Sequence, residues 1–445
     1  MTLRFGTDGV RGVANTELTP ELLLALGRAA ARVLGSGPFL VGRDTRWSGE
    51  LVTAAVAAGL AAEGAHVVDM GVLPTPAVAW HSKAERLPAA MISASHNPFG
   101  DNGVKFFIAG GLKLADATEA LLEAELGRDA AAGTPPTGTG VGRITERDGR
   151  PPYLEFLAAS LGGRRLDGMR LVLDCANGAT STVAAELFRS LGADVEVLFA
   201  EPDGRNINDG CGSTHPEELQ RAVVVAGADA GLAFDGDGDR VVAVDATGRL
   251  VDGDEIIALC AVDRRGRGLL PGDTVVVTVM ANLGFRQAMS ARGVQVVDTA
   301  VGDRYVLEAL EKGGWVLGGE QSGHVIYRDL ATTGDGMLTG LQVLDVMART
   351  GRPLAELAAV MTRRPQVLRN VRVASRDLAG ADGLWAEVRA VEERLEGTGR
   401  VLIRPSGTEP LVRVMVEAAT VEEAEAASLQ LVDAAVRALG PAAGG

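Results

Sequence analysis

Reactive side chains crowd around Ser95, in a stretch that reads ISASHNP. His96 and Asn97 follow the serine directly, and Lys105, one of only four lysines in the chain, lies shortly after them. An apolar run precedes the stretch, and Pro98 can continue neither a helix nor a central strand. Because reactive groups on open α/β sheets collect at strand ends, we expect Ser95 to present its hydroxyl on an exposed turn. A plain connecting turn is the alternative.

Three aspartates at alternate positions form a second candidate site. Asp235, Asp237 and Asp239 are separated by glycines and follow an apolar run. Carboxylates this close repel one another unless a cation lies among them. An EF-hand loop is ruled out, because Arg240 and Ala246 stand where that loop needs glycine and glutamate. An all-oxygen site at a strand end suits Mg²⁺ that completes its shell with a phosphate oxygen, and a solvated acidic turn is the alternative.

A candidate anion site lies near the C-terminal end, where the sequence reads RPSGTEP. It combines a guanidinium, two hydroxyls and glycine-flanked backbone N–H groups, a set that can wrap a phosphate dianion. These groups belong to Arg404, Ser406, Gly407 and Thr408. Arg413, on the following strand, could reach the same anion. A hairpin turn is the alternative, since Ser-Gly and Pro are common turn residues.

A fourth polar loop, GGEQSGH, follows another apolar run. It carries the carboxylate of Glu320, the hydroxyl of Ser322 and the imidazole of His324. Such groups can bind sugar hydroxyls, and a polar glycine turn is the alternative. No Walker A sequence occurs, no GxGxxG opens a helix after a strand, and no GxSxG surrounds Ser95.

The elements that must position these loops follow a repeated pattern. A strand, a Gly- or Asn-containing loop, a helix ending in glycine and a β-branched strand recur at 39–68, 170–199 and 274–297. This is the pattern of a βαβ unit, and three copies predict three related α/β domains. Strands and helices beyond a junction near 363–365 predict a compact α+β domain of about 80 residues.

Three local expectations complete the outline. The opening sequence RFGTDGVRG predicts a Gly-rich turn that carries Arg11. A helix is expected to begin at Thr19-Pro20 and to end at Gly35. The Pro-, Gly- and Thr-rich stretch between 129 and 150 predicts a linker or surface loop. The expected domains are 1–150, 151–252, 253–365 and 366–445.

Composition narrows the class of protein. At 445 residues the chain is too long for one core. A net charge of −15 argues against nucleic-acid and anionic-membrane surfaces, and no apolar run of about 18 residues predicts a membrane span. The three cysteines form no CxxC pair, so neither a disulfide framework nor a zinc site is indicated. We expect a cytoplasmic protein, and a homodimer is left open as its assembly.

In this order and spacing, SASHNP, DGDGDR, GEQSGH and RPSGTEP resemble the α-D-phosphohexomutase superfamily. The sequences RFGTDGVRG, CGSTHPE, VGDRYV and TTGDG extend the resemblance over nearly the whole chain and are similar to members that act on glucosamine phosphates. The resemblance implies an α/β enzyme of four domains, with three mixed α/β domains and a smaller C-terminal domain around a central cleft.

The resemblance also implies a role for each loop. The serine would carry a phosphoryl group as phosphoserine, the aspartates would hold one Mg²⁺ beside it, and the last loop would grip the phosphate that is not reacting. The expected catalytic residues are Ser95, His96, Lys105, His324 and Arg11; the expected metal ligands are Ser95, Asp235, Asp237 and Asp239; and the expected substrate-binding residues are Arg240, Glu320, Ser322, Arg404, Ser406, Gly407, Thr408 and Arg413. Which residue acts as the base is not decided by the sequence.

The implied reaction interconverts glucosamine 6-phosphate and glucosamine 1-phosphate through glucosamine 1,6-bisphosphate, on the route to UDP-N-acetylglucosamine and the cell wall. Phosphoglucomutase or phosphomannomutase activity is the alternative within the superfamily. A metal-dependent phosphatase would need no distant phosphate clamp. A binding protein without activity would be expected to have lost Ser95 or one of the aspartates.

Overall fold

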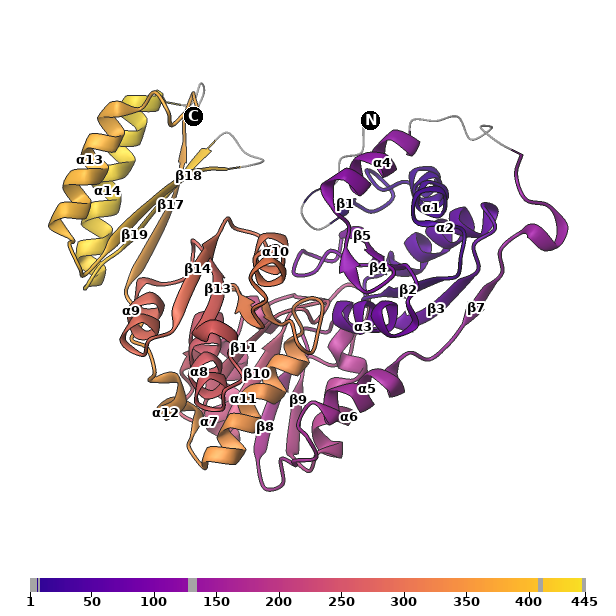
Figure 1. Cartoon of the computed structure of the whole chain (residues 1–445), viewed down its shortest axis with the longest axis horizontal. Helices are drawn as coiled ribbons and strands as arrows, with labels where there is room; N and C mark the ends of the chain where they lie inside the picture. The colour runs from indigo at the N-terminus through magenta and orange to yellow at the C-terminus, as the bar shows by residue number, and fades with distance from the viewer. Residues whose placement is uncertain (1–5, 7–8, 127–133, 407–410, 442–445) are drawn as a thin grey trace. The chain divides into compact units, whose positions relative to one another are not determined.

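The computed structural model describes residues 6, 9–126, 134–406 and 411–441. The chain divides into two compact units: Met1–Met280 with Gly293–Val360, and Ala281–Arg292 with Met361–Gly445. The first unit carries three mixed sheets, and the second carries one antiparallel sheet. Figure 1 follows the chain through these elements by colour.

The first sheet has seven strands and leads to the Ser95 stretch. Its strand order is β1 (Val10–Val13), β5 (Asp101–Ile108), β4 (Ala89–Ile92), β2 (Phe39–Arg43), β3 (Val67–Val72) and β7 (Ile144–Glu146), with β6 (Leu112–Lys113) added to β5. The strands β4, β2, β3 and β7 run parallel, whereas β5 is antiparallel to β4, β1 and β6.

Helices cover both faces of this sheet. Helices α1 (Pro20–Leu34) and α2 (Gly49–Ala62) enclose a core that contains Phe39 and Val41. Successive strand residues point to opposite faces, so Gly42 faces α3 (Thr75–Glu85) on the other side. A Cβ on Gly42 would lie 2.5 Å from the side chain of Val78 in this helix. The expected first helix is confirmed: the Thr19 hydroxyl accepts a hydrogen bond from the N–H of Leu22, and the helix ends before Gly35.

The second and third sheets repeat the order of the first. The second is β12 (Leu250–Val251), β11 (Val241–Asp245), β10 (Ala230–Phe234), β8 (Arg170–Asp174) and β9 (Asp194–Leu198). The third is β14 (Gln295–Thr299), β13 (Thr274–Thr278), β15 (Leu317–Gly319) and β16 (Val325–Tyr327). Their helices include α5 (Arg150–Ala159), α6 (Ala184–Ser190), α7 (Glu217–Ala226), α8 (Gly253–Gly266), α10 (Asp303–Gly313) and α11 (Gly336–Thr350).

The three sheets share one topology, which confirms the prediction of three related α/β domains. In each, two parallel strands from a βαβ unit are joined by a third parallel strand, and an antiparallel fourth strand follows it. The connection between the third and fourth strands carries SASHNP in the first sheet, DGDGDR in the second and GEQSGH in the third. Three of the four loops predicted from the sequence therefore occupy equivalent positions.

The second unit is an antiparallel sheet with helices. Its strand order is β17 (Gln366–Arg372), β19 (Leu411–Glu417) and β18 (Arg400–Pro405). Figure 1 shows α13 (Asp382–Arg394) and α14 (Val421–Leu439) side by side on this sheet. The unit also contains α9 (Leu283–Ala291), which the βαβ pattern assigns to the third repeat.

A buried carboxylate ties α9 to this sheet. The Glu417 side chain is fully buried, and it accepts hydrogen bonds from the Asn282 amide at 3.1 Å and the Leu283 N–H at 3.0 Å. The guanidinium of Arg400 donates to the same carboxylate at 2.6 Å. A buried charge that lacked these partners would be strongly destabilising.

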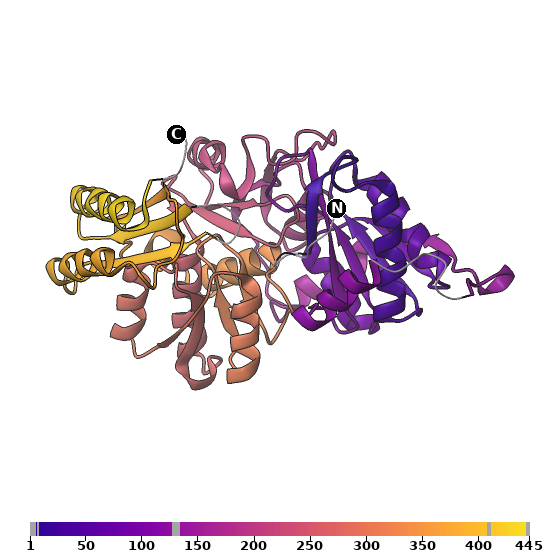
Figure 2. The ribbon, with the colours of Figure 1, turned by 90° about the horizontal axis from the view of Figure 1, so that it is seen from above.

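One local prediction was wrong and another was incomplete. Val10, Arg11 and Gly12, expected within a turn, belong to the strand Val10–Val13, because pairing with β5 overrides the loop preference of their glycine-rich neighbours. The stretch expected to be a linker contributes the edge strand Ile144–Glu146, which pairs with β3. Figure 2 shows the segment that leads to this strand projecting at the right of the view. Within the described residues, no helix combines the length and apolar character needed to cross a membrane.

Candidate active site

Ser95 lies on the turn after β4, as predicted, but it is buried rather than exposed. Only 1% of its surface is accessible, because the loop after β10 covers it. Its hydroxyl donates a hydrogen bond to Oδ2 of Asp235 at 2.7 Å, and Nδ1 of His96 lies 3.4 Å from Oγ. Gly236 makes the close approach feasible, since a Cβ there would lie 2.6 Å from the Ser95 carbonyl oxygen.

The three aspartates form a buried cluster that fits a metal ion. Asp235, Asp237 and Asp239 each offer an oxygen, and these oxygens all lie within 4.8 Å of one another. Oδ1 of Asp237 and Oδ1 of Asp239 are buried and have no hydrogen-bond partner among the described residues. Buried acceptors left unsatisfied are costly, and hard oxygen ligands are those that Mg²⁺ prefers. The donor set therefore fits a divalent cation.

Cations already offset part of this negative charge. Nζ of Lys105 donates to Oδ2 of Asp237 at 2.8 Å and lies 3.8 Å from Oδ2 of Asp239. The Thr75 hydroxyl donates to the same Asp237 oxygen at 2.6 Å. Burial raises the pKa of Asp235 well above its ordinary range, and the other two carboxylates raise it further. Burial also acts to raise the pKa values of Asp237 and Asp239, but the cations outweigh it and both are lowered.

His96 is held neutral beside the serine. Burial lowers the pKa of this imidazole to about 4, and the positive charges of Arg240 and Arg11 add to the effect. Arg11 lies on β1, opposite Gly103. Arg240 donates its backbone N–H to Oδ1 of Asp235 at 3.1 Å, and its Nε lies 3.8 Å from Oδ1 of Asp239. An uncharged ring therefore lies beside the Ser95 hydroxyl, and two arginines act on that ring.

His324 joins the third loop to the aspartates. Its Nδ1 lies 3.6 Å from Oδ2 of Asp239, and its Nε2 lies 3.4 Å from Oδ2 of Asp303. Burial acts to lower the pKa of His324, but Asp239 and Asp303 outweigh it and the pKa is raised. The backbone N–H of Gly334 donates to Nε2 at 3.1 Å, and Lys113 forms an ion pair with Asp303.

The GEQSGH loop packs directly beside the DGDGDR loop, at the start of β11. The N–H of Val241 donates to the Gly323 carbonyl at 3.1 Å, and a Cβ on Gly323 would lie 2.1 Å from the Val241 carbonyl oxygen. Gly323 also has a φ of +92°, which favours glycine. Glu320 accepts a hydrogen bond from the N–H of Gly302 at 3.2 Å, and Ser322 is exposed on the same turn. The structure thus brings the first three predicted loops together.

The predicted anion site lies in the second unit. Arg404 stands opposite Arg413 on β18 and β19, and the Nε atoms of both are buried without a hydrogen-bond partner among the described residues. Burial lowers the pKa of Arg404, and the positive charge of Arg413 lowers it further. Two adjacent guanidiniums repel one another unless an anion offsets them. Ser406 is buried, while Gly407 and Thr408 lie outside the described residues.

Several residues at these sites were missed by the sequence analysis. They are Asp44, Thr75, Ser93, Asn208, Asp303 and Arg376. Arg376 donates to the carbonyl of Ser406 at 2.8 Å. Asp303 belongs to the VGDRYV sequence, and the family resemblance of that sequence was the one signal that could have identified it. Thr75 and Ser93 donate to carboxylates, and Asn208 to a backbone carbonyl, from distant parts of the chain; Asp44 is the acceptor of the Ser93 hydroxyl. Such long-range contacts leave no local sequence pattern.

Comparison with known proteins supports this arrangement. Family models of the phosphoglucomutase/phosphomannomutase domains match the chain: α/β/α domain I at 2–132, α/β/α domain II at 151–248, α/β/α domain III at 252–364 and the C-terminal domain at 368–434. A phosphoglucosamine mutase of Pelotomaculum thermopropionicum is 55% identical over 425 residues, which cover 94% of this chain and 95% of that relative.

Solved structures show the same fold. A phosphoglucomutase/phosphomannomutase family protein of Burkholderia thailandensis matches with a TM-score of 0.82 and 27% identity, covering 98% of each chain. An Aspergillus fumigatus N-acetylphosphoglucosamine mutase, in complex with GlcNAc-6P and magnesium, matches with a TM-score of 0.72 and 20% identity, covering 99% of this chain and 96% of that one. With all four domains matched and a relative this similar over nearly its whole length, the chain belongs to the phosphoglucomutase/phosphomannomutase family.

Proposed function

We propose that the protein interconverts glucosamine 6-phosphate and glucosamine 1-phosphate, with Ser95 as the phosphoryl carrier. The observation that carries this proposal is the hydrogen bond from the Ser95 hydroxyl to Asp235, one of the three buried aspartates, at 2.7 Å. A phosphatase would also place a serine beside a metal, but the paired guanidiniums of Arg404 and Arg413 supply the second anion site that a mutase needs. The substrate is taken from the name of relatives at 55% identity.

The proposed cycle begins with a phosphoryl group on Ser95. A hydroxyl of the sugar phosphate attacks this phosphorus, the bond from phosphorus to Ser95 Oγ breaks, and the sugar becomes glucosamine 1,6-bisphosphate. The proton of the attacking hydroxyl passes to a base of the enzyme. In the reverse sense, Ser95 Oγ then attacks the phosphorus of the other phosphoryl group, the bond from that phosphorus to the sugar oxygen breaks, the sugar oxygen takes the proton back from the base, and the isomeric monophosphate leaves.

The residues around Ser95 suit such a transfer. Lys105, Arg11 and Arg240 supply positive charge where the phosphoryl oxygens would lie. A Mg²⁺ held by the three aspartates would neutralise further negative charge on the transferring group. The neutral ring of His96, 3.4 Å from Ser95 Oγ, and His324 are the candidates to hold the proton. Glu320 and Ser322 are proposed to contact the sugar, and Arg404, Ser406, Gly407, Thr408 and Arg413 to hold the second phosphate.

One assay separates the proposal from its alternatives. Glucosamine, glucose and mannose 6-phosphates are compared as substrates, with and without a chelator, and inorganic phosphate release is followed in parallel. We expect glucosamine phosphate to be isomerised fastest, and activity to disappear with the chelator and return with Mg²⁺. Preference for glucose or mannose phosphate would contradict the substrate, and stoichiometric phosphate release would indicate a phosphatase. The cytoplasmic location and the homodimer stay predictions.

A further inference from the structure

A single buried arginine holds the backbone of the Ser95 turn. The Arg46 side chain is fully buried, and each of the five N–H bonds of its guanidinium has an acceptor. Nη2 donates to the carbonyls of Ser95 and Asn97, both at 2.8 Å. Nη1 donates to the carbonyls of Pro98 and of Asp101, the latter at 3.0 Å. Four carbonyls of one turn therefore point at one guanidinium.

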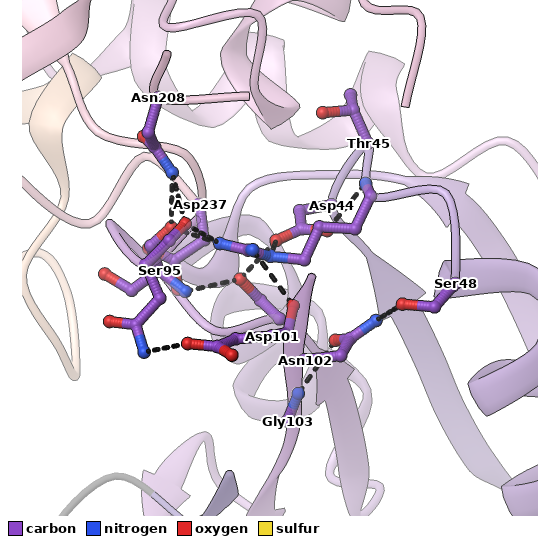
Figure 3. Close-up of polar contacts among 12 residues, drawn as sticks. Asp44, Thr45, Ser48, Ser95, Asp101, Asn102, Gly103, Asn208 and Asp237 are labelled. Atoms are coloured by element: carbon purple, nitrogen blue, oxygen red, sulfur yellow. Dashed lines mark hydrogen bonds and ion pairs between the residues drawn. The ribbon is translucent and has the colours of Figure 1, made fainter. Parts of the chain in front are cut away.

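Asp44 fixes the orientation of this guanidinium. Its Oδ2 accepts from Nε of Arg46 at 2.9 Å and from the Ser93 hydroxyl at 2.6 Å. The Ser93 hydroxyl oxygen in turn accepts the backbone N–H of Ser95 at 2.9 Å. The turn is thus held both through its carbonyls and through the amide of Ser95. Figure 3 shows these contacts gathered around Ser95 and Asp44.

A second donor reaches the same carbonyls from the second sheet's loops. The Asn208 amide donates to the Ser95 carbonyl at 2.9 Å and to the Asn97 carbonyl at 3.2 Å, as Figure 3 shows for Ser95. Each of these carbonyls therefore has two donors, one from Arg46 and one from Asn208. Ser95 has a φ of +52°, in the left-handed region that is unfavourable for a serine. The two donors hold the turn in this conformation.

We propose that Arg46, oriented by Asp44 and assisted by Asn208, is a positioning residue for phosphoryl transfer. The inference rests on the proposed function, in which Ser95 gains and loses a phosphoryl group in every cycle. Its Oγ must return to the same place each time, although the charge it carries changes. A turn held through its backbone keeps that place without using the Ser95 side chain. Misplacement by about 1 Å can cost about 10²-fold in rate.

The test compares Arg46→Lys with Arg43→Lys in the full-length enzyme. A lysine keeps the charge but offers one point donor in place of a planar fork, so it can satisfy only some of the carbonyls. We expect Arg46→Lys to lower kcat by about 10²-fold, with little change in the KM for sugar phosphate. Arg43 lies three positions earlier and pairs with Asp69 at 3.2 Å, and its variant is expected to keep the natural kcat.

Two further measurements separate positioning from general destabilisation. In Arg46→Lys, amide hydrogen exchange should rise within 94–103 and stay unchanged in β8 and β13. Arg46 also borders a cavity of about 450 Å³ together with Trp47 and Glu50, and a small solute is expected to pass from it into the place that Arg46→Gly would vacate. Added guanidinium is therefore expected to restore part of the kcat of Arg46→Gly, and to leave Arg43→Gly unchanged.

Asn208→Asp provides an independent variant should Arg46→Lys not fold. Asn208 has a φ of +59°, which aspartate tolerates about as well as asparagine, so the change replaces the donor by an oxygen that repels the two carbonyls and leaves the backbone preference unchanged. We expect a fall in kcat at constant KM. Because Arg46 and Asn208 act on the same two carbonyls, the effects of the two substitutions should not add.

Each outcome decides the inference. A natural kcat in Arg46→Lys and Asn208→Asp, or a loss seen mainly in KM, would overturn it. Faster exchange throughout the chain, or no rescue by guanidinium, would show that Arg46 only stabilises the fold. Failure of the proposed function is recognised separately: the natural enzyme would then not isomerise glucosamine phosphate, whereas local exchange in 94–103 would still report on the turn.

Discussion

At the scale of single residues, the site is dominated by burial rather than by exposure. Ser95 was expected on an exposed turn, and its position after a strand is as predicted, but the loop of the second sheet covers it. Burial strengthens the interactions of charged groups and makes an unpaired charge costly. The aspartates, Lys105 and the two histidines therefore depend on one another for their charge states. Because a substitution of one of these residues changes the charge states of the others, we expect it to lower kcat more than it raises the KM for sugar phosphate.

Removal of the carrier hydroxyl is the most direct test at this scale. Ser95→Ala should lower turnover by several orders of magnitude, because no covalent phosphoryl intermediate can form. Intact-mass measurement of the natural protein should find a phosphate adduct that maps to Ser95. Ser190→Ala, at the end of α6, serves as the control and should keep full activity. Near-normal turnover in Ser95→Ala would exclude the serine as carrier.

Glu320 is expected to favour the amino sugar. A protonated 2-amino group would gain a charge-assisted hydrogen bond from this carboxylate, whereas a neutral hydroxyl gains less. Glu320→Gln keeps the oxygen that accepts the N–H of Gly302, so the loop should stay in place. We expect the ratio of kcat/KM for glucosamine phosphate over glucose phosphate to fall in the variant. An unchanged ratio would mean that Glu320 does not contact the amine.

At the scale of elements, one connection is used three times. The loop between the third and the fourth strand begins at the carboxyl end of a parallel strand in each sheet. Ligand-binding loops of open α/β sheets lie at this end. The first sheet places the proposed phosphoryl carrier there, the second the carboxylates and the third the proposed sugar contacts. A repeated topology has thus given different chemistry to equivalent positions, through loop sequence alone.

The start of α11 offers a pH-dependent test of stability. Asp335 caps this helix, accepting the Leu338 N–H at 2.9 Å and the Tyr153 hydroxyl at 2.8 Å. Burial raises the pKa of Asp335 from 3.8 to about 6. The folded protein therefore binds a proton that the unfolded chain releases between these values, so the stabilisation is present below pH 3.8 and is lost as the pH rises through 6.

Asp335→Asn removes this titration; the amide oxygen can still accept the Leu338 N–H, and the amide NH₂ can donate to the Tyr153 oxygen in place of accepting from it. Relative to the variant, the natural protein should gain about 1 kcal/mol in free energy of unfolding as the pH falls from 7 to 5.5. Denaturant unfolding of both proteins at several pH values measures the difference. A difference that does not change with pH would show that Asp335 has an ordinary pKa in the folded protein.

At the scale of the whole molecule, the sequence predicted much of what is observed. The βαβ pattern located three sheets, and the four polar loops were found because their residue types are unusual at strand ends. The strand β1 was missed because the glycines in and before it favour a turn, and β7 because its neighbours are Pro, Gly and Thr. The role of Arg46 was also missed, because its acceptors are main-chain carbonyls from a turn about 50 residues further along the chain.

The second unit should contribute to substrate binding and little to the chemistry. Arg404→Ala should raise the KM for sugar phosphates by about 10²-fold, as expected if a charged hydrogen bond of about 1.5–3 kcal/mol is lost. Stability should hardly change, because the substitution also relieves repulsion from Arg413. Arg389→Ala, an exposed position on α13, is the control. Unchanged kinetics in Arg404→Ala would mean that the distal phosphate is held elsewhere.

The contacts of Glu417 with α9 bear on how such enzymes can be recombined. A chimaera joined at the boundary between the third and fourth family domains, after residue 364, would take β19 from one parent and Asn282 and Leu283 from the other. The buried carboxylate would then keep its partners only if both parents happened to match. Exchanging 281–292 together with the C-terminal segment preserves them. The two segments that must come from the same parent are therefore separated along the gene. Chimaeras that take both segments from one parent should fold more often than chimaeras that divide them.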